Sequence, residues 1–168
     1  TLQYLPDSLA WVKVSGASWL GDGFFYSRYP YTATGKELST KNENHQVFYH
    51  KVGTPQAEDE MVYEDPKNPL RFHGVYTDEE ERYIFLDVSD RSKVKGNAVW
   101  YYDNNKTEKT FLPLVKTPGE FNYGLVDVYK GKFLVSTNDG ARNQKIVLVD
   151  PANPDPKNWK TVIPEKEE

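Results

Sequence analysis

The 168-residue sequence contains no cysteine, which excludes disulfides, thiolate metal sites and thiol catalysis. It lacks an apolar run long enough to cross a membrane as a helix, and its mean hydropathy is -0.75. Clustered positive charge of the kind that binds phosphate backbones is also missing, because the net charge is -4 with both signs interspersed. We therefore expect neither a membrane nor a nucleic acid as a partner.

Patterns typical of catalysis or metal binding are equally scarce. The nearest approach to a Gly-x-Ser-x-Gly nucleophile elbow is Gly16–Leu20, which lacks the final glycine. His45, His50 and His73 show no metal-ligand spacing, so we interpret them as surface or packing residues, with His73 the one nearest a central channel. The acidic run Glu58–Glu60 is typical of a solvated turn. We predict no catalytic residue, no metal site and no cofactor in this chain.

The sequence does contain many aromatic residues and an internal repeat. Aromatic residues make up 14% of the chain, which favours strands because rings pack well on a pleated surface. Strand-like runs recur about every 50 residues, at Val47–Lys51, Val99–Asp103 and Ile146–Asp150. Further runs flank each of these, and the last run of each repeat is followed by a proline: Pro66, Pro113 and Pro164. Each repeat therefore predicts four short strands, the content of one propeller blade.

The fold that this repeat predicts is all-β, a partial β-propeller of about three four-stranded antiparallel blades. We place the blades at residues 15–66, 67–117 and 118–168, with residues 1–14 as the end of a preceding blade. A single β-sandwich is the alternative, but it would not explain a four-strand module that occurs three times. We expect the four tryptophans to pack between blades: Trp11, Trp19, Trp100 and Trp159.

Three blades are too few to close a ring, since propellers typically have about four to eight. The terminal blades would then expose apolar faces and strand edges that proteins normally cover. We therefore expect that the chain either belongs to a longer protein or self-associates through its exposed blade faces.

Several segments resemble one protein family. Val12–Trp19 and Gly23–Pro30 are similar to the propeller domain of the prolyl oligopeptidase family, and Val47–Asp59 continues the resemblance. The Gly-Thr-Pro-Gln segment at residues 53–56 is its most specific part. Asn143–Asp150 and Asn158–Glu165 look like the third and fourth strands of a later blade.

The resemblance implies a fragment of a seven-bladed propeller that covers an α/β-hydrolase domain in the same parent chain. In that family the hydrolase domain carries the serine, aspartate and histidine and cleaves short peptides after proline, while the propeller restricts access. The expected partners are that catalytic domain and short proline-containing peptides, and this chain alone should be inactive. Bacterial relatives imply a periplasmic or a cytoplasmic location, with the periplasm preferred.

The resemblance also points to one loop. The segment Asp90–Asn97 lies between the second and third strands of the second blade, where the family has a stretch that faces the catalytic domain. Only Asn97 clearly matches that stretch. Arg91 and Asn97 are the candidate substrate-binding residues, because both can hydrogen-bond a peptide backbone; the alternative is a solvated loop. The alternative function for the whole chain is a stand-alone binding or scaffold module that closes its ring by oligomerising.

Overall fold

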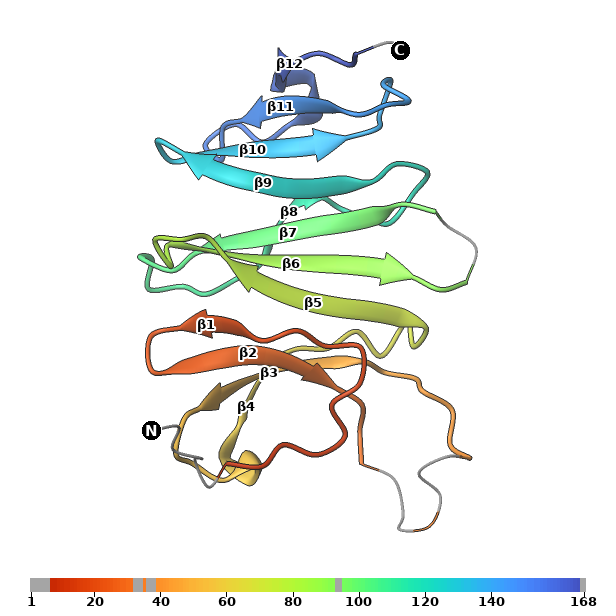
Figure 1. Ribbon diagram of the computed structural model, residues 1–168, viewed down its shortest axis with the longest axis vertical. Helices are drawn as coiled ribbons and strands as arrows, with labels where there is room; N and C mark the ends of the chain where they lie inside the picture. The colour runs from red at the N-terminus through yellow and green to blue at the C-terminus, as the bar shows by residue number, and fades with distance from the viewer. Residues whose placement is uncertain (1–6, 32–34, 36–38, 93–94, 167–168) are drawn as a thin grey trace.

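The computed structural model describes residues 7–31, 35, 39–92 and 95–166, which form three antiparallel sheets (Figure 1). Blade 1 contains β1 (Ser18–Leu20), β2 (Gly23–Arg28), β3 (Gln46–Lys51) and β4 (Glu60–Tyr63). Blade 2 contains β5 (Arg71–Thr77), β6 (Tyr83–Asp90), β7 (Asn97–Asp103) and β8 (Leu112–Val115). Blade 3 contains β9 (Tyr123–Tyr129), β10 (Lys132–Thr137), β11 (Lys145–Val149) and β12 (Lys160–Ile163).

Each blade is a meander whose consecutive strands pair antiparallel. Figure 1 shows the blades stacked in chain order, from blade 1 in red and orange to blade 3 in blue. The prediction of three four-stranded antiparallel blades is confirmed. Two short 3-10 helices, η1 (Gln56–Glu58) and η2 (Pro156–Asn158), precede the last strands of blades 1 and 3. No helix in the described part of the chain has the length and apolar character needed to span a membrane.

The hairpin turns follow from local sequence. β9 and β10 are joined by Lys130 and Gly131 alone, since Tyr129 pairs with Lys132. Both turn residues have positive φ, 51° for Lys130 and 72° for Gly131. A two-residue hairpin of this type needs that conformation at both positions so that its twist matches the strands.

The hydrophobic core lies between the blades. β6 is buried on both faces, with Ile84 and Leu86 packed toward blade 1 and Phe85 packed toward blade 3. There are thus two cores, one between blades 1 and 2 and one between blades 2 and 3. In the core between blades 2 and 3, the ring of Phe133 from blade 3 meets Phe85 edge-on at a centroid distance of 5.0 Å. Edge-to-face aromatic pairs add about 0.5–1.5 kcal/mol to the burial itself. Adjacent blades are therefore fixed to each other by rigid aromatic contacts.

Two local predictions were wrong. Trp19 is 57% exposed rather than packed between blades, although Trp100 and Trp159 do pack against the two cores. Pro113 lies inside β8 rather than after it, opposite Trp100. β8 is the outermost strand of blade 2, and an edge strand tolerates a residue without an N–H.

Candidate functional site

The family-specific segment at residues 53–56 forms a sharp turn after β3. Gly53 has a φ of 86°, a conformation that favours glycine. Its backbone N–H donates to Oδ2 of Asp7 at 2.7 Å, and the same oxygen lies 3.5 Å from Nε2 of His50. The turn thereby holds the segment that leads into β1, residues 7–17, which we call the entering segment.

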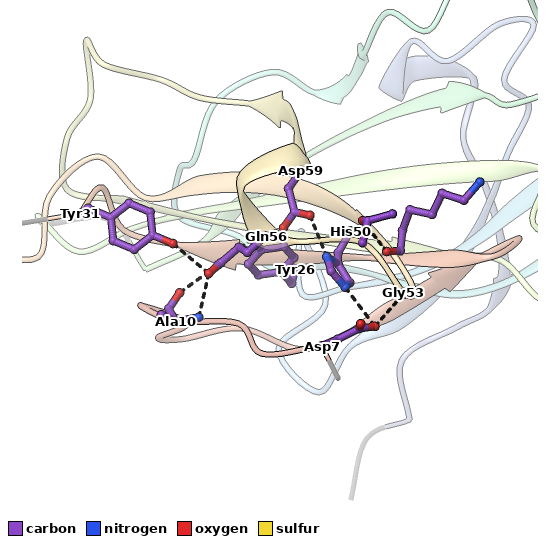
Figure 2. A network of polar contacts seen from close by, with 10 residues as sticks. Asp7, Ala10, Tyr26, Tyr31, His50, Gly53, Gln56 and Asp59 are labelled. Atoms are coloured by element: carbon purple, nitrogen blue, oxygen red, sulfur yellow. Dashed lines mark hydrogen bonds and ion pairs between the residues drawn. The ribbon is translucent and has the colours of Figure 1, made fainter. Parts of the chain in front are cut away.

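Asp59 follows η1, and its side chain is completely buried. Figure 2 shows the ring of His50 between Asp59 and Asp7. Oδ1 of Asp59 is 2.7 Å from Nδ1 of His50, and its Oδ2 accepts the hydroxyl of Tyr26 at 2.6 Å. An ionised carboxylate can only accept, so Nδ1 of His50 is the donor. Burial is the largest cause that raises the pKa of the Tyr26 hydroxyl above its ordinary value, and the hydrogen bond to Asp59 adds to it.

Gln56 satisfies all four hydrogen-bonding positions of its side-chain amide. Oε1 accepts the backbone N–H of Ala10 at 2.9 Å and the hydroxyl of Tyr31 at 2.8 Å. Nε2 donates to the carbonyl of Ala10 at 3.1 Å and to the hydroxyl of Tyr26 at 3.0 Å. The amide therefore pairs with Ala10 as the backbone of a neighbouring strand would.

We call this network the clasp, and Figure 2 shows that its members converge from the entering segment, β2, β3 and the η1 turn. Its residues are Asp7, Ala10, Tyr26, Tyr31, His50, Gly53, Gln56 and Asp59. No serine or threonine hydroxyl in the described part of the chain is hydrogen-bonded to His50. The clasp ties the segment before β1 to β2, β3 and the η1 turn.

The solvated-turn interpretation of Glu58–Glu60 is wrong for Asp59, the centre of the clasp. That interpretation rested on composition alone, since three adjacent acidic residues usually face water. The missed signal was a Gly-Thr-Pro-Gln turn set between two strand-like runs. Such a turn indicates a fixed backbone shape, and the polar residues around it then need partners.

The candidate segment 90–97 begins with the last residue of β6, Asp90, and ends with the first residue of β7, Asn97, so only residues 91–96 form the loop, of which residues 93 and 94 lie outside the described part. Arg91 is exposed and lies 4.7 Å above the ring of Phe72. Its guanidinium donates to the carbonyl of Leu70 at 3.2 Å and to the carbonyl of Asn42. Arg91 thus connects the loops at the ends of blades 1 and 2.

Asn97 makes more contacts than a solvated loop residue would. Its Oδ1 accepts the backbone N–H of Tyr123 at 2.7 Å, and its Nδ2 donates to the carbonyl of Tyr123 at 2.8 Å and to Asp87. Burial raises the pKa of the Asp87 carboxyl, and the bond from Asn97 partly opposes this rise. Arg91 and Asn97 are therefore both engaged within the protein, and a role in substrate binding stays a prediction.

The other residues considered for chemistry have structural partners. Ser18 shares its hydroxyl with Thr77 across the boundary of blades 1 and 2, at 3.3 Å between the two oxygens. His45 and His73 are each 1% exposed at the same boundary. No group of three or more potential metal ligands occurs among the described residues.

Comparison with known proteins identifies the family to which this chain belongs. A family profile described as "Prolyl oligopeptidase, N-terminal beta-propeller domain" matches residues 1–168. The chain belongs to the prolyl oligopeptidase family, within its N-terminal propeller domain. A prolyl endopeptidase from Elizabethkingia miricola is 39% identical over 100% of this chain and 23% of its own length. A dual function macrocyclase-peptidase from Amanita bisporigera is 31% identical over 98% of this chain.

Solved structures agree with the sequence comparison. Prolyl oligopeptidase B from Galerina marginata, bound to a 35-residue hydrolysis and macrocyclization substrate, superimposes with a TM-score of 0.86. It is 27% identical, and the match covers 98% of this chain and 23% of that one. The predicted family and fold are confirmed. This prolyl oligopeptidase propeller segment spans about a quarter of the length of the relatives that it matches.

Proposed function

We propose that this chain is part of the size-selecting propeller wall of a prolyl oligopeptidase. The catalytic α/β-hydrolase domain would lie in the same longer chain and would cleave short peptides after proline. The observation that carries this proposal is the match over all of the chain to a protein named prolyl endopeptidase, of which it covers only 23%. Neither the described structure nor the reported relatives supports a ring closed by oligomerisation.

The physical argument is that a wall excludes large substrates only if its blades do not separate. The two aromatic cores hold the three blades together, and the clasp fixes the chain where it enters blade 1. Well-packed interiors resist deformation, so a folded protein cannot force its way between such blades. A short flexible peptide needs no such separation. In this proposal the blades contribute selection, and none of their residues contributes a reacting group.

The proposal is tested with the full-length protein that carries this chain. We expect it to cleave a short fluorogenic peptide after its internal proline. A folded protein that displays the same sequence in a surface loop should stay intact over the same time and be cut only after it is unfolded. Absence of cleavage after proline would contradict the proposed activity. Equal cleavage of the short peptide and the folded protein would contradict the role of the propeller.

The candidate loop residue Arg91 is tested in the same assay. If Arg91 contacts the peptide backbone, Arg91→Ala should raise KM for the short peptide several-fold and leave kcat nearly unchanged, because it removes binding rather than chemistry. Arg142→Ala, at an exposed arginine in the β10–β11 loop of blade 3, is the matched control. An unchanged KM for Arg91→Ala would assign Arg91 only to the loop contacts described above.

A further inference from the structure

A second polar cluster lies at the boundary of blades 1 and 2, apart from the clasp. His45, just before β3, and His73, in β5, are both 1% exposed, and their rings stack at a centroid distance of 6.2 Å. The cluster also receives Lys13 of the entering segment and Ser27 of β2. Four parts of the chain therefore meet around these two buried histidines.

The contacts fix which nitrogen of His45 carries the proton. The backbone N–H of His73 points at Nδ1 of His45, at 3.0 Å, so Nδ1 must offer a lone pair. Nε2 lies 3.0 Å from the carbonyl of Lys13 and must donate to it. His45 is therefore neutral in this arrangement. A proton on Nδ1 would set two donors against each other and break the bond to His73.

His73 is constrained in a different way. Its Nδ1 lies 2.7 Å from the carbonyl of His45 and donates to it, while its Nε2 is buried and has no hydrogen-bond partner. A proton on that Nε2 would be a buried, charged donor without an acceptor, which is unfavourable. The carbonyl of His73 accepts the hydroxyl of Ser27 at 2.7 Å, so its backbone stays tied to blade 1 on the other side.

The charged groups around the two histidines do little to offset the preference for the neutral form of both rings. Burial is the largest cause that lowers the pKa of both histidines, and His73 and Arg91 lower the pKa of His45 further. The hydrogen-bonded carbonyls oppose this shift, that of Lys13 at His45 and that of His45 at His73. Asp65 raises the pKa of His73, whereas Arg71 lowers it, and these two form an ion pair at 3.0 Å. Tyr29, Phe72 and Tyr63 supply the remaining ring contacts. Among the described residues, no carboxylate forms an ion pair with either imidazole.

We propose that His45 and His73 form an acid-sensitive joint, in which protonation of either ring separates β5 from the segment that precedes β3 in blade 1. The open state can take up a proton that the closed state excludes. Its population therefore rises as the pH falls below about 6.5, the ordinary value for histidine, and is constant above it. Each histidine that titrates in this way increases the ratio of open to closed molecules by up to about tenfold for each unit by which the pH falls.

Hydrogen exchange of the full-length protein tests the joint directly. The amide of His73 should show a protection factor, corrected for the intrinsic exchange rate, that is constant from about pH 8 to 7 and falls steeply toward about pH 5. Amides in the core of blade 3, such as Val135, should keep their protection over the same range. A His73 protection factor that does not depend on pH would overturn the proposal.

Two conservative variants separate titration from packing. His45→Asn places an amide oxygen near the position of Nδ1, and His73→Asn places an amide donor near its own Nδ1, so each keeps one contact and removes one titrating group. Each variant should have a flatter pH dependence at residues 71–77 than the wild type, whatever its absolute stability. His50→Asn removes the third histidine and is the matched control, which should keep the wild-type pH dependence there. Steep pH dependence in both joint variants would contradict the assignment.

Discussion

Asn97 pairs with both backbone polar groups of Tyr123, through Oδ1 at 2.7 Å and Nδ2 at 2.8 Å. Gln56 pairs in the same manner with Ala10, at 2.9 and 3.1 Å. In each case a side-chain amide replaces a strand residue where a blade meets a segment outside its own sheet. Antiparallel strands satisfy their edges by such paired bonds, and an amide presents the same donor and acceptor. These two residues therefore join consecutive parts of the propeller.

Asn97→Asp should destabilise the protein by about 2 kcal/mol or more, because it removes the donor to Tyr123 and places a second carboxylate beside the half-buried Asp87. Asn105→Asp is the matched control, since Asn105 lies in an exposed turn, and should change stability by less than about 0.5 kcal/mol. Thermal or denaturant unfolding measures both. Equal stability of the two variants would show that the Asn97 amide does not join the blades.

Gly96→Ala should also destabilise the boundary of blades 2 and 3. A Cβ at Gly96 would lie 1.9 Å from the carbonyl oxygen of Phe121, so one backbone must move. Overpacking of this kind typically costs about 1–3 kcal/mol. Gly74→Ala is the control, because a Cβ there meets no atom within 4 Å. Unfolding experiments that rank Gly74→Ala as the more harmful substitution would contradict this contact.

The fold was predictable because its repeat is carried by many residues at once. Every blade needs large side chains on its middle strands, and runs such as Val99–Asp103 predict a middle strand wherever they occur. A single residue such as Trp19 has no comparable redundancy. It lies on a short inner strand with one partner, β2, and its exposure depends on neighbours that its own sequence position does not reveal.

The clasp and the histidine joint were much less accessible from the sequence. Both depend on partners distant in the chain, such as Asp7 with Gly53 and Lys13 with His45. Local composition made Asp59 look solvated and left His45 without a function. Short-range patterns predict strands and turns, but the burial of one polar side chain is decided by which distant backbone group comes to meet it.

Tyr26→Phe isolates one bond of the clasp. Removal of the hydroxyl leaves Oδ2 of the buried Asp59 without its donor and takes away one of the two acceptors of Gln56 Nε2, which should cost about 1–3 kcal/mol. Tyr129→Phe is the control, because Tyr129 is 55% exposed, and it should be nearly neutral. Denaturant unfolding gives both values. If Tyr26→Phe is also neutral, water replaces the hydroxyl and the clasp is weaker than its geometry indicates.

Asp87→Asn tests an aspartate whose pKa is raised by burial. Burial favours the protonated carboxyl in the folded state, so the unfolded state binds fewer protons between the ordinary and the raised pKa. Stability should therefore fall as pH rises through that interval and stay lower above it. Asparagine has no charge to bury and can still accept a bond from Nδ2 of Asn97, so Asp87→Asn should gain stability relative to the wild type from about pH 4 to 7. The histidine joint makes stability rise with pH, but it does so equally in the wild type and in Asp87→Asn. The difference between their free energies of unfolding therefore reports on Asp87 alone. Asp127→Asn, at an exposed carboxylate, should run parallel to the wild type, and a parallel curve for Asp87→Asn would show that Asp87 is solvated.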